Sequence, residues 1–245
     1  MKRKIMVALL LVLFVGPLFV AVSGTVSYNK DWRTAPRNST GIAPNVEQFS
    51  DAVVQVYSAR AFNWRGVFGV HTWLATKEVN AKEYKVHQVI GWQLYRNLPV
   101  VISEPDLPDR SWYGQDPEIL VDIRGEKAAG LINDIQNAVD SYPYNSKYHV
   151  WPGPNSNTFT AWVGRQVPGL NLQLPSTAIG KDYLPNNKFI DKTPSGTGYQ
   201  FSLFGIVGVS AAKTEGFEIN LLGLNFGIDF NQTALILPGV DRVGF

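Results

Sequence analysis

The sequence contains no cysteine, only three histidines and only two methionines among its 245 residues. The lack of cysteine excludes disulfides, thiolate metal ligands and a thiol nucleophile. The spacings of His71, His87 and His149 do not favour a histidine-rich metal cluster. We therefore expect no metal and no cofactor, and any catalytic chemistry would use oxygen or imidazole groups.

The chain also lacks an excess of charge of either sign. It has 22 basic and 20 acidic residues; without the N-terminal Lys2, Arg3 and Lys4, the remaining 19 basic and 20 acidic residues give a net charge of −1. Because no basic stripe remains to neutralise phosphates, we do not expect a nucleic-acid partner. The composition is 45% hydrophobic, which is enough for one substantial core.

The three basic residues precede a run from Ile5 to Val22 that contains no charged residue. This order is typical of an export signal, and Ala21 and Ser23 supply the small residues of a cleavage site. The run is longer than is usual for a cleaved signal, so an uncleaved anchor is the alternative. We predict a signal peptide or signal anchor over residues 1–23 that contacts the membrane. The body is then exported, and lies in the periplasm or is anchored to the inner membrane facing the periplasm.

Residues 24–48 are polar, are interrupted by Pro36, Gly41 and Pro44, and show no sustained period. They predict a linker that lifts the body off the membrane. The rest of the chain, residues 49–245, is predicted to form a single domain.

The domain begins with segments rich in β-branched and alternating residues, which predict strands. These segments are residues 52–60, 67–76, 84–95 and 119–123. Leu131, Ile135 and Val139 keep helical spacing in a helix predicted over 126–142, which Pro143 ends. With a second helix after Pro154, the pattern predicts an α+β fold in which helices pack on an antiparallel sheet.

Two apolar segments that contain several glycines, residues 201–212 and 217–230, close the chain. We predict that they form a hairpin or paired buried strands, since each is too short to cross a bilayer as a helix. Docking on a membrane surface is the alternative interpretation. Lys181 and Asp182 stand in an apolar loop before them and predict a local ion pair.

The segment Trp151–Val163 is a proline-rich loop that leads into a helix. Pro152 and Pro154 hold the chain extended up to Pro154, and Asn155 or Ser156 suits the N-cap. Ser156 is thus expected at a helix N-terminus, where backbone N–H groups and the macrodipole stabilise negative charge. The segment is either a well-capped helix start or a serine nucleophile with an oxyanion hole.

His71, in a predicted strand, is the candidate base for Ser156 if its imidazole reaches within about 3 Å of the hydroxyl. The alternative is a histidine satisfied within the core. His87 or Gln88 could orient His71, and strand alternation allows only one of them to face it. The candidate binding residues are Asn155, Asn157, Trp73, Trp151 and Arg65; the arginine could hold a carboxylate or phosphate.

A strand histidine followed by Asn155-Ser-Asn-Thr-Phe159 at a helix start resembles the circularly permuted papain-like enzymes. This group relates NlpC/P60 peptidases, lecithin-retinol acyltransferase and DeSI-type isopeptidases, and its later motif is Asn-Cys-x-x-Phe. The resemblance implies a permuted papain-like core with Ser156 at the nucleophile position and His71 at the histidine position. Serine departs from the cysteine of the group, and a hydroxyl is far harder to ionise than a thiol.

Nearly the whole chain after the signal is similar to an uncharacterised bacterial envelope family, a domain of unknown function. The runs that carry this similarity include Trp64-Arg-Gly66, His71-Thr-Trp73, Ser141-Tyr-Pro-Tyr144 and Thr177-Ala-Ile-Gly-Lys-Asp-Tyr-Leu-Pro185. The family implies no particular activity.

Two functional hypotheses follow. The first is an acyl-transfer or amide/ester hydrolase site, with Ser156 as nucleophile, His71 as base and backbone N–H groups as the oxyanion hole. The second is a catalytically inactive papain-like module that binds an envelope ligand, peptidoglycan or lipid, at the same place. The relative position of His71 and Ser156 distinguishes the two.

Overall fold

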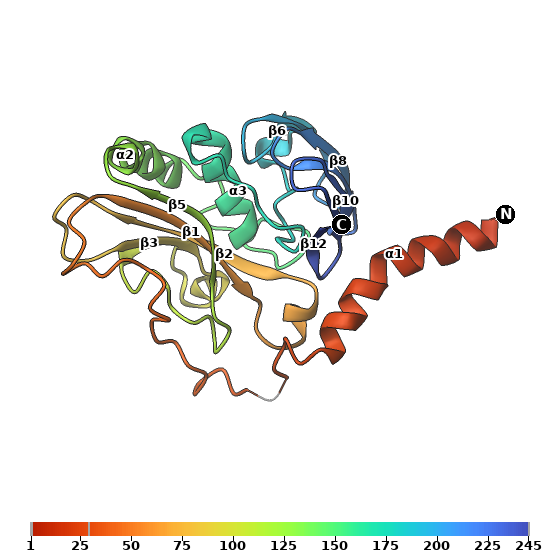
Figure 1. Ribbon diagram of the computed structural model, residues 1–245, viewed down its shortest axis with the longest axis horizontal. Coiled ribbons are helices and arrows are strands. Elements are labelled where there is room, and N and C mark those ends of the chain that lie inside the picture. Colours follow the sequence, from red (N-terminus) through yellow and green to blue (C-terminus); the bar gives the residue numbers. More distant parts are fainter. Residues whose placement is uncertain (1, 29, 245) are drawn as a thin grey trace.

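The computed structural model describes residues 2–28 and 30–244. Met1, Asn29 and Phe245, which fall in the predicted signal, linker and domain, lie outside the described residues. The predicted α+β class is confirmed, with two antiparallel sheets of five and seven strands. Figure 1 shows helices α2 and α3 over one face of the five-stranded sheet, with the seven-stranded sheet beyond α3.

The five-stranded sheet has the order β4-β3-β2-β1-β5, and every neighbouring pair is antiparallel. Its strands are β1 (Val53–Arg60), β2 (Val70–Lys77), β3 (Lys85–Val89), β4 (Val101–Pro105) and β5 (Glu118–Arg124). Two predicted strands are shorter than expected, because the 3₁₀ helices η1 (Asn63–Val67) and η2 (Gly91–Arg96) occupy their ends. Strand β4 was not predicted: it is an edge strand that ends in a proline, and prolines obscure a strand pattern.

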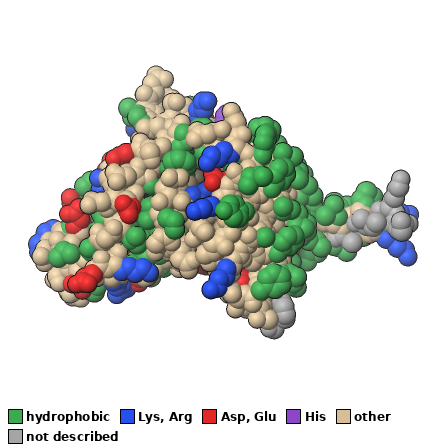
Figure 2. All heavy atoms as spheres, turned by 90° about the horizontal axis from the view of Figure 1, so that it is seen from above, with side chains coloured by type: hydrophobic (Ala, Val, Ile, Leu, Met, Phe, Trp, Pro, Cys, Tyr) green, Lys and Arg blue, Asp and Glu red, His purple; other side chains and the backbone are tan. Residues whose placement is uncertain are grey.

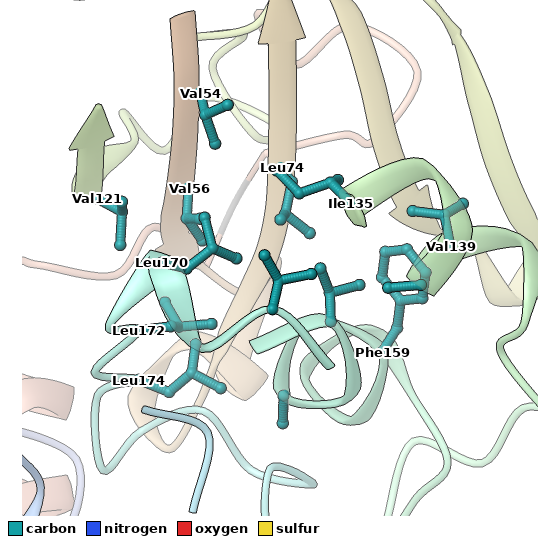
Figure 3. Packing of buried hydrophobic residues seen from close by; sticks show 14 of the residues in the cluster. Val54, Val56, Leu74, Val121, Ile135, Val139, Phe159, Leu170, Leu172 and Leu174 are labelled. Atoms are coloured by element: carbon teal, nitrogen blue, oxygen red, sulfur yellow. The ribbon is translucent and has the colours of Figure 1, made fainter. Parts of the chain in front are cut away.

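Helices α2 (Glu126–Asp140) and α3 (Ser156–Gln166) cover one face of this sheet. In Figure 3, Leu74 of β2, Ile135 of α2 and Phe159 of α3 belong to one packed cluster. Phe159 is fully buried, whereas Trp162 is half-buried and its indole Nε1 donates to the Ala138 carbonyl at 2.8 Å. The helical face predicted for α3 is therefore correct.

The opposite face of the sheet carries a second cluster that includes Tyr57 and Trp73. The predicted linker packs against it through Ala43 and Val46. Residues 24–28 and 30–48 contain no helix and no strand, but the buried Asp109 carboxylate accepts from Ser39 Oγ at 2.7 Å and from two backbone amides of the segment. The segment thus packs on the domain surface through residues 39–46.

The seven strands of the second sheet follow one another in chain order from β6 to β12, all antiparallel. They are β6 (Ile190–Lys192), β7 (Gly198–Leu203), β8 (Val207–Ala212), β9 (Gly216–Leu221), β10 (Leu224–Asp229), β11 (Ala234–Leu237) and β12 (Asp241–Gly244). Residues 201–212 and 217–230 each contain a turn, so each segment forms a hairpin rather than one strand. Their large apolar side chains are exposed, which corrects the expectation of buried strands.

Helix α1 (Lys2–Val22) projects from the body in Figure 1. Its C-terminal half packs on the body, where Pro17 lies against Gly239 and Val20 is buried in a small cluster with Val67. Within residues 2–28 and 30–244, no helix combines the length and the apolarity needed to cross a membrane.

A buried ionic network joins the loop before β6 to the inner face of the seven-stranded sheet. Lys181 Nζ lies 2.5 Å from Glu218 Oε2, and Arg242 contacts Glu218 at 3.3 Å and Asp229 at 2.8 Å. The Asp182 carboxylate, 3.5 Å from Lys181 Nζ, accepts from the side-chain amides of Asn220 and Asn225. The predicted Lys181–Asp182 pair is present, but it is one part of a network that crosses between the two parts of the fold.

Candidate functional site

Helix α3 begins with a complete capping box. The Asn155 side chain accepts from the backbone amides of Asn157 and Thr158 at 3.0 and 3.1 Å, and Thr158 Oγ1 accepts from the Asn155 backbone amide. Asn155 Nδ2 also donates to the carbonyls of Val150 and Ile179. Asn155 is therefore the N-cap, and its side chain ties the helix start to the neighbouring loops.

Asn157 connects the same helix start to strand β2. Its amide oxygen accepts from Thr72 Oγ1 at 2.9 Å, and its Nδ2 donates to the carbonyls of Val70 and Ile179. Asn155 and Asn157 are 5% and 3% exposed. Both predicted binding residues are thus buried and engaged with the fold, so they present no free polar group to a ligand.

Ser156 is the first residue of α3 and is 4% exposed. Among the described residues, its hydroxyl makes no hydrogen bond. A surface hollow of about 460 Å³ lies beside the same loop, lined by residues that include His149, Pro154 and Tyr183, but neither Ser156 nor His71 is among its lining residues.

His71 points to the other side of the sheet. Thr72 and Leu74 of β2 face α3, as shown by the Thr72–Asn157 hydrogen bond and by Leu74 in the cluster with Phe159. Side chains alternate along a strand, so His71 faces away from α3, on the side of Trp73. The structure therefore does not bring the predicted base to Ser156; the sheet lies between them.

The two candidates to orient His71 are now separated. Gln88 faces it, with Oε1 3.3 Å from His71 Nε2. His87 lies on the α3 side of the sheet, where its ring contacts Thr76 Oγ1 at 3.0 Å and Ser103 Oγ at 2.8 Å. Burial lowers the pKa of His71 to about 3 and the pKa of His87 to about 4, so both imidazoles are neutral at pH 7.

His71 belongs to a stack of aromatic rings that leads from the core to the surface. Its ring is 3.7 Å from Trp112 and 5.6 Å from Trp73, between ring centroids, and Trp73 stacks in turn on the buried Tyr57. On the outer side, Trp112 stacks on Trp92 at 6.1 Å, and Trp92 is 47% exposed.

Tyr113 completes this edge of the stack. Its ring stands perpendicular to Trp112 at 5.1 Å and to Trp92 at 6.0 Å, and the Arg37 guanidinium lies over it at 4.4 Å. We call Trp92, Trp112 and Tyr113 the aromatic surface. It combines partly exposed ring faces with a nearby cation and, through His71, with the Gln88 amide.

The remaining predicted binding residues lie apart. Trp73 is 3% exposed and donates to the Pro108 carbonyl, so it supports the stack from within. Trp151 is 48% exposed and donates to the Leu222 carbonyl beside the seven-stranded sheet. Arg65 is exposed in η1, with its guanidinium over the Trp64 ring.

Sequence analysis did not identify Trp92, Trp112 or Tyr113. Trp92 alternates in phase with Gln88, which indicates the correct face, but Trp112 and Tyr113 come from a proline-rich loop with no periodic signal. Within the part of the chain that the structure describes, no group of three or more His, Asp or Glu side chains is placed to hold a metal ion.

Fold and site together define an α+β protein in which the start of α3 is hydrogen-bonded to β2 and to the neighbouring loops. The partly exposed aromatic surface lies on the opposite side of the five-stranded sheet. Residues 51–183, more than half of the chain, match a family model described as Protein of unknown function (DUF3750), so the chain belongs to this family. The match covers β1 to α3 and ends before β6. Neither a curated protein nor a solved structure matches the chain.

Proposed function

We propose that the protein is an exported, non-catalytic binding module with a papain-like core, and that it binds the glycan part of peptidoglycan on the aromatic surface. The observation that carries this proposal is the stack of rings from Trp73 through His71 and Trp112 to the exposed Trp92. The basic and then apolar start of α1 supports the export part.

The position of His71 favours binding over hydrolysis. A serine hydroxyl is a weak nucleophile unless a base takes its proton, and proton transfer needs direct or single-water contact. His71 is on the far face of the sheet and is held by Trp112 and Gln88. The capped helix α3 packed on the sheet is compatible with the papain-like core of this proposal, but no base contacts Ser156 among the described residues.

The aromatic surface suits a sugar. The negative face of an aromatic ring attracts the C–H groups on one side of a pyranose ring, and rigid aromatic side chains lose little entropy on binding. Trp92 and Trp112 are held in place by stacking before a ligand arrives. Arg37, over Tyr113, offers a cation to the carboxylate groups of peptidoglycan.

Co-sedimentation of the purified full chain with insoluble peptidoglycan tests this proposal. We expect saturable binding that Trp92→Ala weakens by about tenfold or more, because exposed tryptophans at such surfaces dominate binding. Trp151→Ala is the matched control, since Trp151 is 48% exposed and lies beside the seven-stranded sheet, apart from the aromatic surface, and it should bind like the wild type. Equal binding by Trp92→Ala and the wild type would refute the aromatic surface as the ligand site.

A further inference from the structure

The seven-stranded sheet has its polar and apolar sides reversed relative to a sheet that covers a core. Its inward side chains are polar and buried, with Glu218, Asn220, Asn225 and Asp229 at most 3% exposed. Its outward side chains are apolar and exposed, with Phe217 at 42% and Val209 at 45%. Antiparallel sheets with one wet face normally alternate in the opposite sense.

The charged inward side chains are paired, so the reversed orientation of the sheet is a property of the fold. Glu218 is paired with Lys181, Asp229 with Arg242, and Asn220 with Asp182. Slipping any strand by one residue would bury apolar side chains in this network and expose its charges. As long as the strands keep this register, their apolar side chains must point outward.

The outward residues form continuous rows across the strands. One row runs from β7 to β12 through residues that are partners in the strand register: Tyr199, Ala211, Phe217, Ile228, Leu235 and Val243. A second row contains Phe201, Val209, Ile219 and Phe226. At about 4.8 Å per strand, the face is on the order of 30 Å wide. It is therefore a contiguous apolar patch, whereas the apolar residues on an ordinary protein surface are scattered singly.

The face is continuous with helix α1. In Figure 2, hydrophobic side chains gather on the end of the body from which α1 projects. Gly16 of α1 packs against the Pro238 carbonyl, in the turn between β11 and β12, so closely that a Cβ would clash. Leu10, Leu18 and Phe19 of α1 are 48%, 63% and 62% exposed.

Charge at the rim favours an anionic partner. Lys192 lies on edge strand β6 opposite Tyr199, and Lys213 is exposed in the turn after β8. The acidic residues Glu215, Glu218 and Asp229 are buried, and the partly exposed Asp191 and Asp241 are paired with Lys188 and Arg242. A broad apolar surface with basic residues around it is the pattern of proteins that lie in the membrane interface.

We propose that this apolar face of the seven-stranded sheet, together with the exposed side of α1, docks on the surface of a phospholipid bilayer that contains anionic lipid. The inference is independent of the aromatic surface, and it goes beyond membrane contact through the N-terminal segment alone. The sheet face enters the acyl-chain boundary, and Lys192 and Lys213 lie at the level of the headgroups. The body is then held by two elements in a defined orientation.

The chain contains no cysteine, so a thiol-reactive fluorophore attaches only at a single introduced cysteine. The position of the label is therefore known in each variant. Val209→Cys and Phe217→Cys place an environment-sensitive fluorophore on the sheet face, and Tyr95→Cys is the control because Tyr95 is 91% exposed on η2, away from this sheet. The full chain is reconstituted with vesicles of phosphatidylethanolamine and phosphatidylglycerol, and with vesicles of phosphatidylcholine alone. Circular dichroism confirms that each labelled chain is folded.

We expect lipid-attached quenchers to reduce the emission of the labels at 209 and 217 severalfold more than that of the label at 95, with iodide in water showing the opposite order. The difference should be larger with phosphatidylglycerol. If α1 alone holds the chain, the protein floats with the vesicles but all three labels stay open to iodide, which overturns the proposal. If the labels at 209 and 217 are instead shielded without lipid and in proportion to protein concentration, the face binds a second copy and the proposal fails.

Discussion

Lys181 Nζ lies 2.5 Å from Glu218 Oε2, although strands β6, β7 and β8 separate the two residues in the chain, and both side chains are buried. Burial alone lowers the pKa of the Lys181 ammonium, but the carboxylates of Asp182 and Glu218 outweigh it and the pKa lies above its usual value. Burial raises the pKa of the Glu218 carboxyl, and Lys181 offsets this only in part. This pair joins the matched family region to the seven-stranded sheet.

We therefore predict that Lys181→Ala lowers the free energy of unfolding by about 3 kcal/mol or more, because it leaves a buried carboxylate short of its partner. Lys188→Ala is the control, since the Lys188 side chain is 52% exposed in its pair with Asp191 and its loss should cost less than about 1 kcal/mol. Urea unfolding measures both. Similar costs for the two variants would show that the buried pair does not stabilise the fold.

The core contact of α3 makes a second prediction. Phe159→Ala should cost about 3–5 kcal/mol, because Phe159 is fully buried between α2 and β2. Trp162→Ala should cost less, since Trp162 is half-buried and packs at the edge of α2. Thermal unfolding followed by circular dichroism ranks the two, and the reverse order would contradict the helix register.

The helix start makes a third prediction, which separates Asn155 from its neighbour. Asn155→Ala should cost about 1–2 kcal/mol, because it removes the cap and two further hydrogen bonds. Ser156→Ala should leave the free energy of unfolding nearly unchanged. A fluorophosphonate probe should not label Ser156 in the wild type, since no base contacts its hydroxyl among the described residues. If the probe labels the wild type and both Ser156→Ala and His71→Ala abolish this labelling, the hydrolase hypothesis would be supported instead.

Stability should depend on pH through the buried histidines. Both His71 and His87 have folded pKa values below the unfolded value of 6.5, because burial disfavours the charged ring. Between pH 6.5 and 4 the unfolded chain thus binds more protons, and stability falls as pH falls, by about 1.4 kcal/mol per pH unit for each histidine.

Urea unfolding as a function of pH measures this slope. His71→Gln should reduce it by about half, because His87 then remains as the buried histidine that contributes to it. A slope that is the same in the wild type and in His71→Gln would show that His71 is protonated in the folded protein.

Export gives the fifth prediction. Alkaline phosphatase fused after Phe245 should be active in cells, because the enzyme folds only outside the cytoplasm and the basic residues at the start of α1 stay inside. The same fusion without residues 1–23 is the control and should be inactive. An inactive full-length fusion whose cytoplasmic reporter counterpart is active would contradict export of the body.

Local patterns were enough to predict the first three strands, their antiparallel order and both helices of the domain. Pro154 and Asn155 define the start of α3, and the spacing of Phe159 and Val163 defines its buried face. These features depend on dihedral restriction, capping and a helical period, which act over a few residues. The predicted pairing of the two apolar segments is present, because β8 and β9 form an antiparallel hairpin. The turns within each segment, at Phe204-Gly205 and Leu222-Gly223, were missed because they lie inside apolar runs.

The sequence by itself determined that His71 and Thr72 face opposite sides of their strand and that only one of His87 and Gln88 can face His71. Only the tertiary structure decided which side holds α3, because that depends on Asn157 bonding Thr72, far away in the chain. It likewise decided that the apolar side of the last sheet faces outward, since the ionic network from Lys181 to Glu218 and Arg242 occupies the other side. Alternation is a local property of a strand, whereas the side that becomes the interior is set by residues that meet only after folding.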